Sequence, residues 1–169
     1  MVFRPHRQNS PLLERLNNRE IWVRLAFACA LSNLFIVLLF TLYPLDFDPS
    51  SDSVLRNLRE IDWDLFQDIS RGRSYGSDLV VNLLLLVPFS ASWVTWQVLS
   101  RRATGVRVVL GAGTVCFGIS LGIECSQLLL ADRFMQLADV STNTIGATLA
   151  AFLAVGVLSE IDPQFKASF

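Results

Sequence analysis

The stretch Leu79–Leu99 reads LVVNLLLLVPFSASWVTWQVL, and none of its 21 residues carries a charge. A helix of about 20 mostly apolar residues is long enough to cross the hydrocarbon core of a bilayer. A helix of this length on the surface of a soluble protein needs a charged or strongly polar face toward water, and this stretch lacks one. Leu79–Leu99 therefore predicts a helix that crosses a membrane.

Three other blocks of the chain have the same character. Leu25–Tyr43 has no charge, Val108–Ala131 contains only Glu124 and Leu137–Leu158 contains only Asp139. Charged residues make up 17% of the 169-residue chain, against about 25% in soluble domains. We expect an all-α, polytopic membrane protein, a four-transmembrane-helix bundle with spans at about 25–43, 79–99, 108–131 and 137–158, within one membrane domain at 25–158.

Basic residues predict the orientation of the spans. When successive connections alternate between the two sides, nine Lys and Arg residues fall on the side of the termini and five on the other. Cytoplasmic segments carry the excess of basic residues, so the N-terminal segment 1–24 and the tail 159–169 are expected to be cytoplasmic. The first block is expected to be a retained span, because a 24-residue segment precedes it and no A-x-A cleavage site follows.

The connection between the first two spans contains a different kind of helix. Apolar residues recur at helical spacing between acids, which predicts a short amphipathic helix over about Asp52–Ile69, lying on the outer interface. Trp63 would then lie at the level of the lipid head groups. A solvated loop is the alternative interpretation.

Composition also excludes several partners. The formal net charge is −1, so the chain has no basic field to hold nucleic acid. His6 is the only histidine, which excludes a histidine-rich metal site. No cofactor is expected. Membrane lipids are the expected partners, and a homo-oligomer stays open.

Polar residues inside the spans form three pairs, each three or four residues apart and therefore on one helix face: Asp78–Asn82, Glu124–Gln127 and Asp139–Asn143. In the predicted topology all three pairs lie toward the outer ends of their spans. An ionised side chain at mid-bilayer costs about 2.5–3.5 kcal/mol on insertion scales, so such groups are expected to meet. We predict a ligand-binding polar pocket, open toward the outer face and lined by Asp78, Asn82, Glu124, Gln127, Arg133, Asp139 and Asn143.

The same residues also have a purely structural interpretation. Amides and acids between helices can form plain interhelical hydrogen bonds, worth about 0.6 kcal/mol each. Glu124 could be neutral and hydrogen-bonded, and Arg133 could simply neutralise Glu124 or Asp139.

A separate face of the third span carries small residues. Gly111, Gly118 and Gly122 share it, and the last two have the GxxxG spacing. We expect the glycines to pack against one neighbour while Glu124 and Gln127 face another.

The order of the polar residues resembles the signature of VanZ-like membrane proteins. The later part of that signature is E-x-x-Q…R…D-x-x-x-N-x-x-G, here Glu124 to Gly146, and the earlier part is D-x-x-x-N…P-F, here Asp78 to Phe89. Ser90 stands where the family often has glycine. The resemblance implies a small polytopic protein of the bacterial plasma membrane. The family's namesake is linked to resistance to the glycopeptide antibiotic teicoplanin, a class of drug that acts outside the membrane on lipid-linked cell-wall precursors.

Three functions stay open. The first is binding of an amphiphilic ligand in the pocket, either a lipid head group, a lipid-linked cell-wall precursor or a lipoglycopeptide such as teicoplanin, with Arg133 meeting phosphate or carboxylate. The second is an intramembrane enzyme acting on a lipid, with Glu124 as general acid or base and Asp139 or Asp78 holding a divalent ion. No Ser–His or Cys–His arrangement accompanies that site. The third is an ion-coupled transporter, for which four spans are few and an inverted repeat is lacking.

Overall fold

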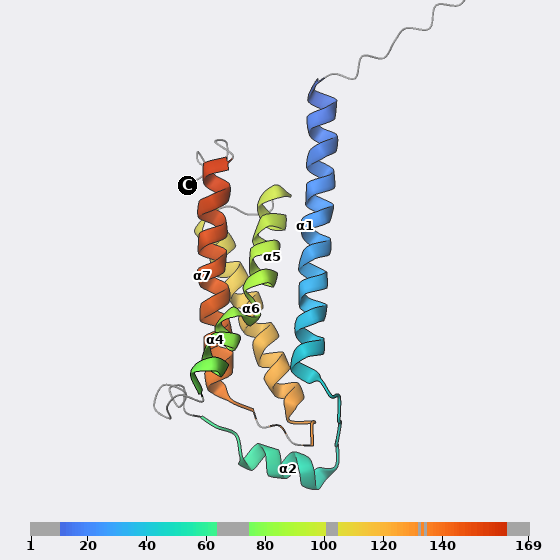
Figure 1. Cartoon of the computed structure of the whole chain (residues 1–169), viewed down its shortest axis with the longest axis vertical. Helices are drawn as coiled ribbons and strands as arrows, with labels where there is room; N and C mark the ends of the chain where they lie inside the picture. Colours follow the sequence, from blue (N-terminus) through green and yellow to red (C-terminus); the bar gives the residue numbers. More distant parts are fainter. Residues whose placement is uncertain (1–10, 64–74, 101–104, 132, 134, 162–169) are drawn as a thin grey trace, which may run out of the picture.

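The computed structural model describes residues 11–63, 75–100, 105–131, 133 and 135–161. Its long helices run alongside one another, and a short helix lies across one end of them (Figure 1). We call this end of the bundle the α2 end. The helices are α1 (Pro11–Leu42), α2 (Ser51–Arg59), α4 (Tyr75–Leu85), α5 (Val87–Leu99), α6 (Val106–Gln127) and α7 (Leu137–Ile161).

Four helical stretches are long and apolar enough to cross a membrane: Asn18–Leu42, Leu79–Leu99, Val106–Gln127 and Leu137–Glu160. The all-α bundle with four spans, and with a short helix between the first and second, is therefore confirmed. α1 has 32 residues, about 48 Å at 1.5 Å per residue, which exceeds the roughly 30 Å hydrocarbon core. It extends beyond the other helices at the end opposite α2 (Figure 1).

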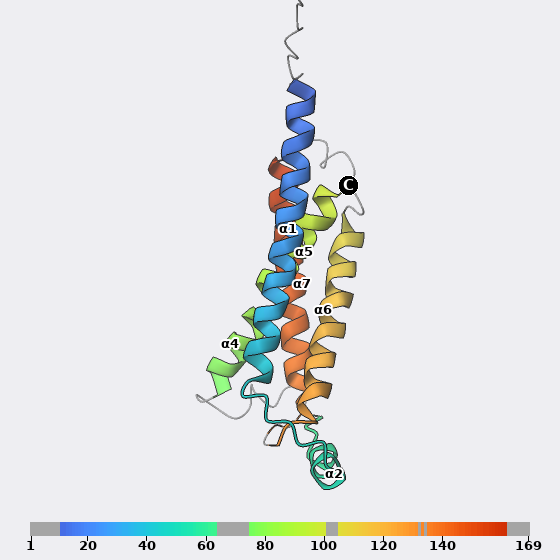
Figure 2. The same ribbon diagram turned by 90° about the vertical axis from the view of Figure 1, so that its right-hand side faces the viewer.

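The second span is built from two helices that meet at Leu86. Pro88 lies in the first turn of α5, where a missing backbone N–H costs no helical hydrogen bond. The axis of α4 is consequently inclined to that of α5, and the first residues of α4 diverge from the bundle (Figure 2). This break lets α4 pack on α7 independently of α5.

Close contact between helices depends on two residues near the middle of α7. A Cβ at Gly146 would overlap the backbone carbonyl of Leu83 on α4, so only glycine permits this approach. The neighbouring Ala147 accepts a buried hydrogen bond from Ser90 Oγ of α5 at 2.6 Å. Ser90, the departure from the family pattern, therefore joins α5 to α7.

Two predicted helix ends are wrong. α6 ends at Gln127 rather than Ala131, and α2 ends at Arg59 rather than near Ile69; residues 64–69 lie outside the described part of the chain. Beyond both helix ends the chain turns, and the connections then pair through the bridges Phe47–Leu130 and Asp62–Gln136. These pairings satisfy backbone groups that a further helical turn would otherwise have satisfied.

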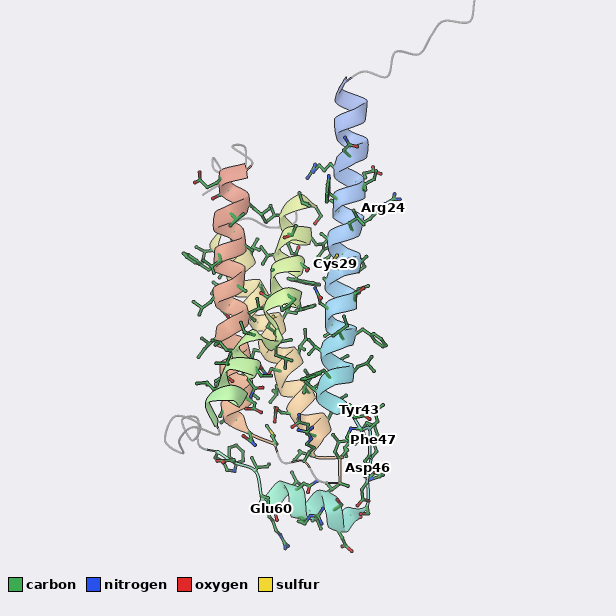
Figure 3. All side chains as sticks on the ribbon, viewed as in Figure 1. Arg24, Cys29, Tyr43, Asp46, Phe47 and Glu60 are labelled. Carbon is green, nitrogen blue, oxygen red and sulfur yellow. The ribbon has the colours of Figure 1, made fainter. Side chains whose placement is uncertain are left out.

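α2 holds the connection between α6 and α7 in place. Its buried Asn57 donates through Nδ2 to the carbonyl oxygens of Leu128 and Leu130, each at 3.0 Å. Leu55 and Leu58 are exposed on another side of α2. Asp46 and Phe47 lie on the segment that descends from α1 to α2, and Glu60 lies at the far end of α2 (Figure 3).

The glycine face of α6 meets no other helix in the described part of the chain. No atom of another segment among the described residues lies within 4 Å of a Cβ built at Gly111, Gly118 or Gly122. α6 instead turns Cys116 and Ser120 into the bundle, where Ser120 accepts a hydrogen bond from Asn143 of α7 and Glu124 accepts one from Gln136 in the adjoining loop.

Candidate functional site

A polar cavity of about 270 Å³ lies at the α2 end, beyond the apolar cluster around Leu86 and Phe89. Side chains from α1, α4, α6 and α7 and from the loop between α6 and α7 line it. Its polar lining residues are Thr41, Asn82, Glu124, Gln127, Arg133, Gln136, Asp139 and Asn143, and its apolar ones are Phe40, Val81, Leu85 and Ile123.

Six of the seven residues predicted from the sequence thus surround one cavity. The seventh, Asp78, belongs to α4, one helical turn before Asn82, but its side chain lies outside the described part of the structure. Three spans that are distant in sequence therefore bring amides and acids to one place. That these residues bind a ligand stays a prediction.

Asn82 and Asp139 join α4 to α7 across the cavity. Asn82 Nδ2 donates to Asp139 Oδ1 at 2.5 Å. Hydrogen bonds to ionised acceptors are shorter and stronger than those between neutral groups. This pair therefore orients both side chains in the cavity wall, and it fixes the amide of Asn82 as a donor toward Asp139.

Glu124 meets the start of α7. Its side chain is only 2% exposed, and Oε2 accepts the backbone N–H of Gln136 at 2.9 Å. Gln136 directly precedes α7, where N–H groups lack helical partners and the helix dipole favours a negative group. Glu124 consequently caps α7 as well as lining the cavity, so part of its burial has a structural cause.

Asn143 lies one helical turn deeper along α7 than Asp139. It is 2% exposed, and its Nδ2 donates to Ser120 Oγ of α6 at 2.9 Å. Its Oδ1 is buried and has no hydrogen-bond partner among the described residues, as is also true of Oδ1 of Asn57 on α2. Buried polar atoms nearly always have partners in native structures, and Asn143, unlike Asn57, lines the cavity.

Arg133 and Gln127 occupy different levels of the cavity. Gln127 is buried at the last residue of α6, whereas Arg133 is exposed in the loop that follows. Among the residues that the structure describes, Arg133 forms no ion pair within 4.0 Å, so the alternative in which it neutralises Glu124 or Asp139 has no direct contact behind it. Its guanidinium is the positive group at the mouth of the cavity.

Three residues that line the cavity or bond its side chains were not predicted from the sequence. Ser120 lies four residues before Glu124, so helical spacing alone places it on the same face and could have identified it. Gln136 contributes a backbone N–H, and Thr41 lies at the end of α1; neither has a signal in the sequence. Within the described ranges, no group of three His, Cys, Asp or Glu residues is placed to hold a metal ion.

Comparison with known proteins gives one match. A family model described as VanZ/LLP1 matches residues 30–159, which is more than half of the chain and includes every residue of the cavity. No curated protein and no solved structure matches the chain.

Proposed function

Since the chain belongs to the VanZ/LLP1 family and is a multi-span membrane protein, we propose that it binds the polar head of an amphiphile in the cavity at the α2 end. The amphiphile is a lipid, a lipid-linked cell-wall precursor or a lipoglycopeptide such as teicoplanin. The proposed setting is the bacterial plasma membrane, with the cavity facing outward.

The observation that carries this proposal is the combination of a polar interior and an apolar rim. Phe40 of α1 and Val81 of α4 line the cavity and are 69% and 46% exposed. Both belong to stretches that are apolar enough to lie in a bilayer, where exposed apolar side chains face acyl chains. A head group in the cavity could therefore keep its hydrocarbon tail against Phe40 and Val81.

Cavity size supports a head group rather than a whole drug. Pockets that enclose drug-sized ligands measure about 300–1,000 Å³, and this cavity is about 270 Å³. A lipoglycopeptide would insert only a terminal part of itself.

Charge distribution supports the outward orientation. The α2 end carries Asp46, Asp52 and Glu60 beside Arg56 and Arg59, whereas Arg19, Arg24 and Arg107 lie toward the opposite end. Arginine is concentrated in cytoplasmic segments. In this orientation Arg133 would meet a phosphate or carboxylate from the outer side.

The direct test is ligand binding by the purified protein in nanodiscs, with a fluorescent short-chain phospholipid as the probe. We expect Arg133→Gln to weaken binding by about tenfold or more, because hydrogen bonds between charged groups contribute about 1.5–3 kcal/mol. Arg24→Gln is the matched control, because Arg24 is exposed near the opposite end and pairs with Glu20 at 3.6 Å. Equal binding by wild type and Arg133→Gln would remove Arg133 from the site.

A second candidate is an intramembrane enzyme that modifies a lipid. It is favoured by the two carboxylates, Glu124 and Asp139, that line the same cavity, where Glu124 would serve as general acid or base. Incubation with radiolabelled envelope lipids, with and without Mg²⁺, tests it. Absence of product from every lipid class would contradict catalysis and leave the binding proposal in place.

A further inference from the structure

Two side-chain amides in the wall of the cavity donate to the protein. Asn82 Nδ2 bonds Asp139 and Asn143 Nδ2 bonds Ser120. The other end of the Asn143 amide, Oδ1, is a hydrogen-bond acceptor without a partner among the described residues. Glu124 is a further acceptor, because a carboxylate can accept about four hydrogen bonds and the N–H of Gln136 supplies one. Beside the amides of Gln127 and Gln136, the wall therefore offers acceptors to a bound group that donates hydrogen bonds.

Charge is distributed unevenly in the same cavity. The two acids, Glu124 and Asp139, come from the helices, whereas Arg133 comes from the exposed loop. A positive group is consequently favoured against the helical wall and a negative group at the mouth. The separation matches a molecule that carries a positive and a negative group a few bonds apart.

We propose that the cavity selects a zwitterionic head group, whose primary ammonium reaches Asn143 and Glu124 while its phosphate meets Arg133. This inference rests on the proposed function and names the ligand class for it. The phosphoethanolamine head of a diacyl lipid has this chemistry, and so does soluble phosphoethanolamine. A trimethylammonium head carries the same charge without N–H donors, and a phosphoglycerol head carries O–H donors without the charge.

The test compares three short-chain lipids with identical tails and ethanolamine, choline or glycerol head groups, using the full-length protein in nanodiscs. We expect the ethanolamine lipid to bind about tenfold more tightly than either of the others, because only its head group donates charged hydrogen bonds. Such a bond stabilises a complex by roughly 1.4 kcal/mol more than a neutral bond, which corresponds to a tenfold difference in affinity. Soluble phosphoethanolamine and phosphocholine, added as competitors, show whether the head group alone is recognised or the whole lipid is required.

Variants at the cavity floor sharpen the test. Asn143→Leu removes the acceptor, so the preference for ethanolamine over choline should fall toward one. Asn143→Asp keeps acceptor oxygens at the same position and should retain the preference, which makes it the informative variant if Asn143→Leu does not fold. Asn33→Leu is the matched control, because Asn33 bonds the Pro88 carbonyl and Ser92 away from the cavity.

The outcomes separate this inference from the proposed function. Equal affinities for the three lipids, each still weakened by Arg133→Gln, would overturn the ammonium proposal and support amphiphile binding. A preference for the glycerol lipid would overturn it as well, because a hydroxyl would then be the recognised donor. Failure of all three lipids to bind would overturn the ammonium proposal and would contradict the proposed function for phospholipids.

Discussion

The hydrogen bond from Asn82 to Asp139 is the shortest polar link between spans that the cavity contains. It joins residues 57 positions apart in the chain, so it can form only after α4 has packed on α7. Interhelical hydrogen bonds in membrane proteins average about 0.6 kcal/mol. A bond to a carboxylate is expected to exceed that average, because charge-assisted hydrogen bonds are roughly twice as strong as neutral ones.

A double-mutant cycle with Asn82→Ala and Asp139→Ala measures this link. We expect a coupling free energy of about 1–2 kcal/mol in reversible unfolding from detergent micelles. The control cycle uses Asn33 and Ser92, whose neutral side-chain hydrogen bond is 3.1 Å long, and should give about 0.6 kcal/mol. Coupling near zero for Asn82 and Asp139 would show that each side chain is stabilised independently.

Glu124 shows that structure and function can use the same side chain. Its bond to the N–H of Gln136 stabilises the start of α7, which supports the structural interpretation for that oxygen. Asn143 differs, because its buried Oδ1 has no partner among the described residues. The functional interpretation therefore rests more securely on Asn143 and Arg133 than on Glu124.

At the scale of helices, the contact between α4 and α7 determines the shape of the cavity. α4 can approach α7 because Pro88 interrupts the second span and because Gly146 leaves room for the carbonyl of Leu83. Without this approach, Asn82 would not reach Asp139. The break in the second span and Gly146 in the fourth span therefore both serve to bring α4 close to α7.

Gly146→Ala should therefore destabilise the protein. Inserting a methyl group into a well-packed contact costs about 1–3 kcal/mol, and backbone, unlike a side chain, cannot rotate away. Gly118→Ala is the matched control, because the space at Gly118 is open and alanine favours helix by up to about 1 kcal/mol. Thermal unfolding in detergent should show a lower Tm for Gly146→Ala and an unchanged or higher Tm for Gly118→Ala. Equal Tm values for the two variants would contradict the close approach of α4 and α7.

At the scale of the whole molecule, the bundle has two chemically different ends. The α2 end carries the cavity, with Arg133 at its mouth, and α2 lies across this end of the bundle (Figure 1). The opposite end carries the long extension of α1 and several arginines. An outward α2 end agrees with the concentration of basic residues on the cytoplasmic side.

Cysteine labelling in intact cells tests this orientation. In a background where Cys29, Cys116 and Cys125 are replaced by serine, Glu60→Cys should react with a membrane-impermeant maleimide. Arg107→Cys, exposed at the start of α6, should react only after the cells are permeabilised. The reverse pattern would place the cavity on the cytoplasmic side and would exclude ligands of the outer leaflet.

The membrane class, the four spans and the faces that carry polar pairs follow from the amino-acid sequence, because long uncharged runs and helical spacing are local properties. The ends of α2 and α6 do not follow from it, since they depend on backbone pairing of Phe47 with Leu130 and of Asp62 with Gln136. The spacing of the α6 glycines identifies a face without identifying its neighbour. That Asn82, Glu124, Arg133 and Asn143 surround one cavity is visible only in the folded bundle, because it depends on how separate helices cross.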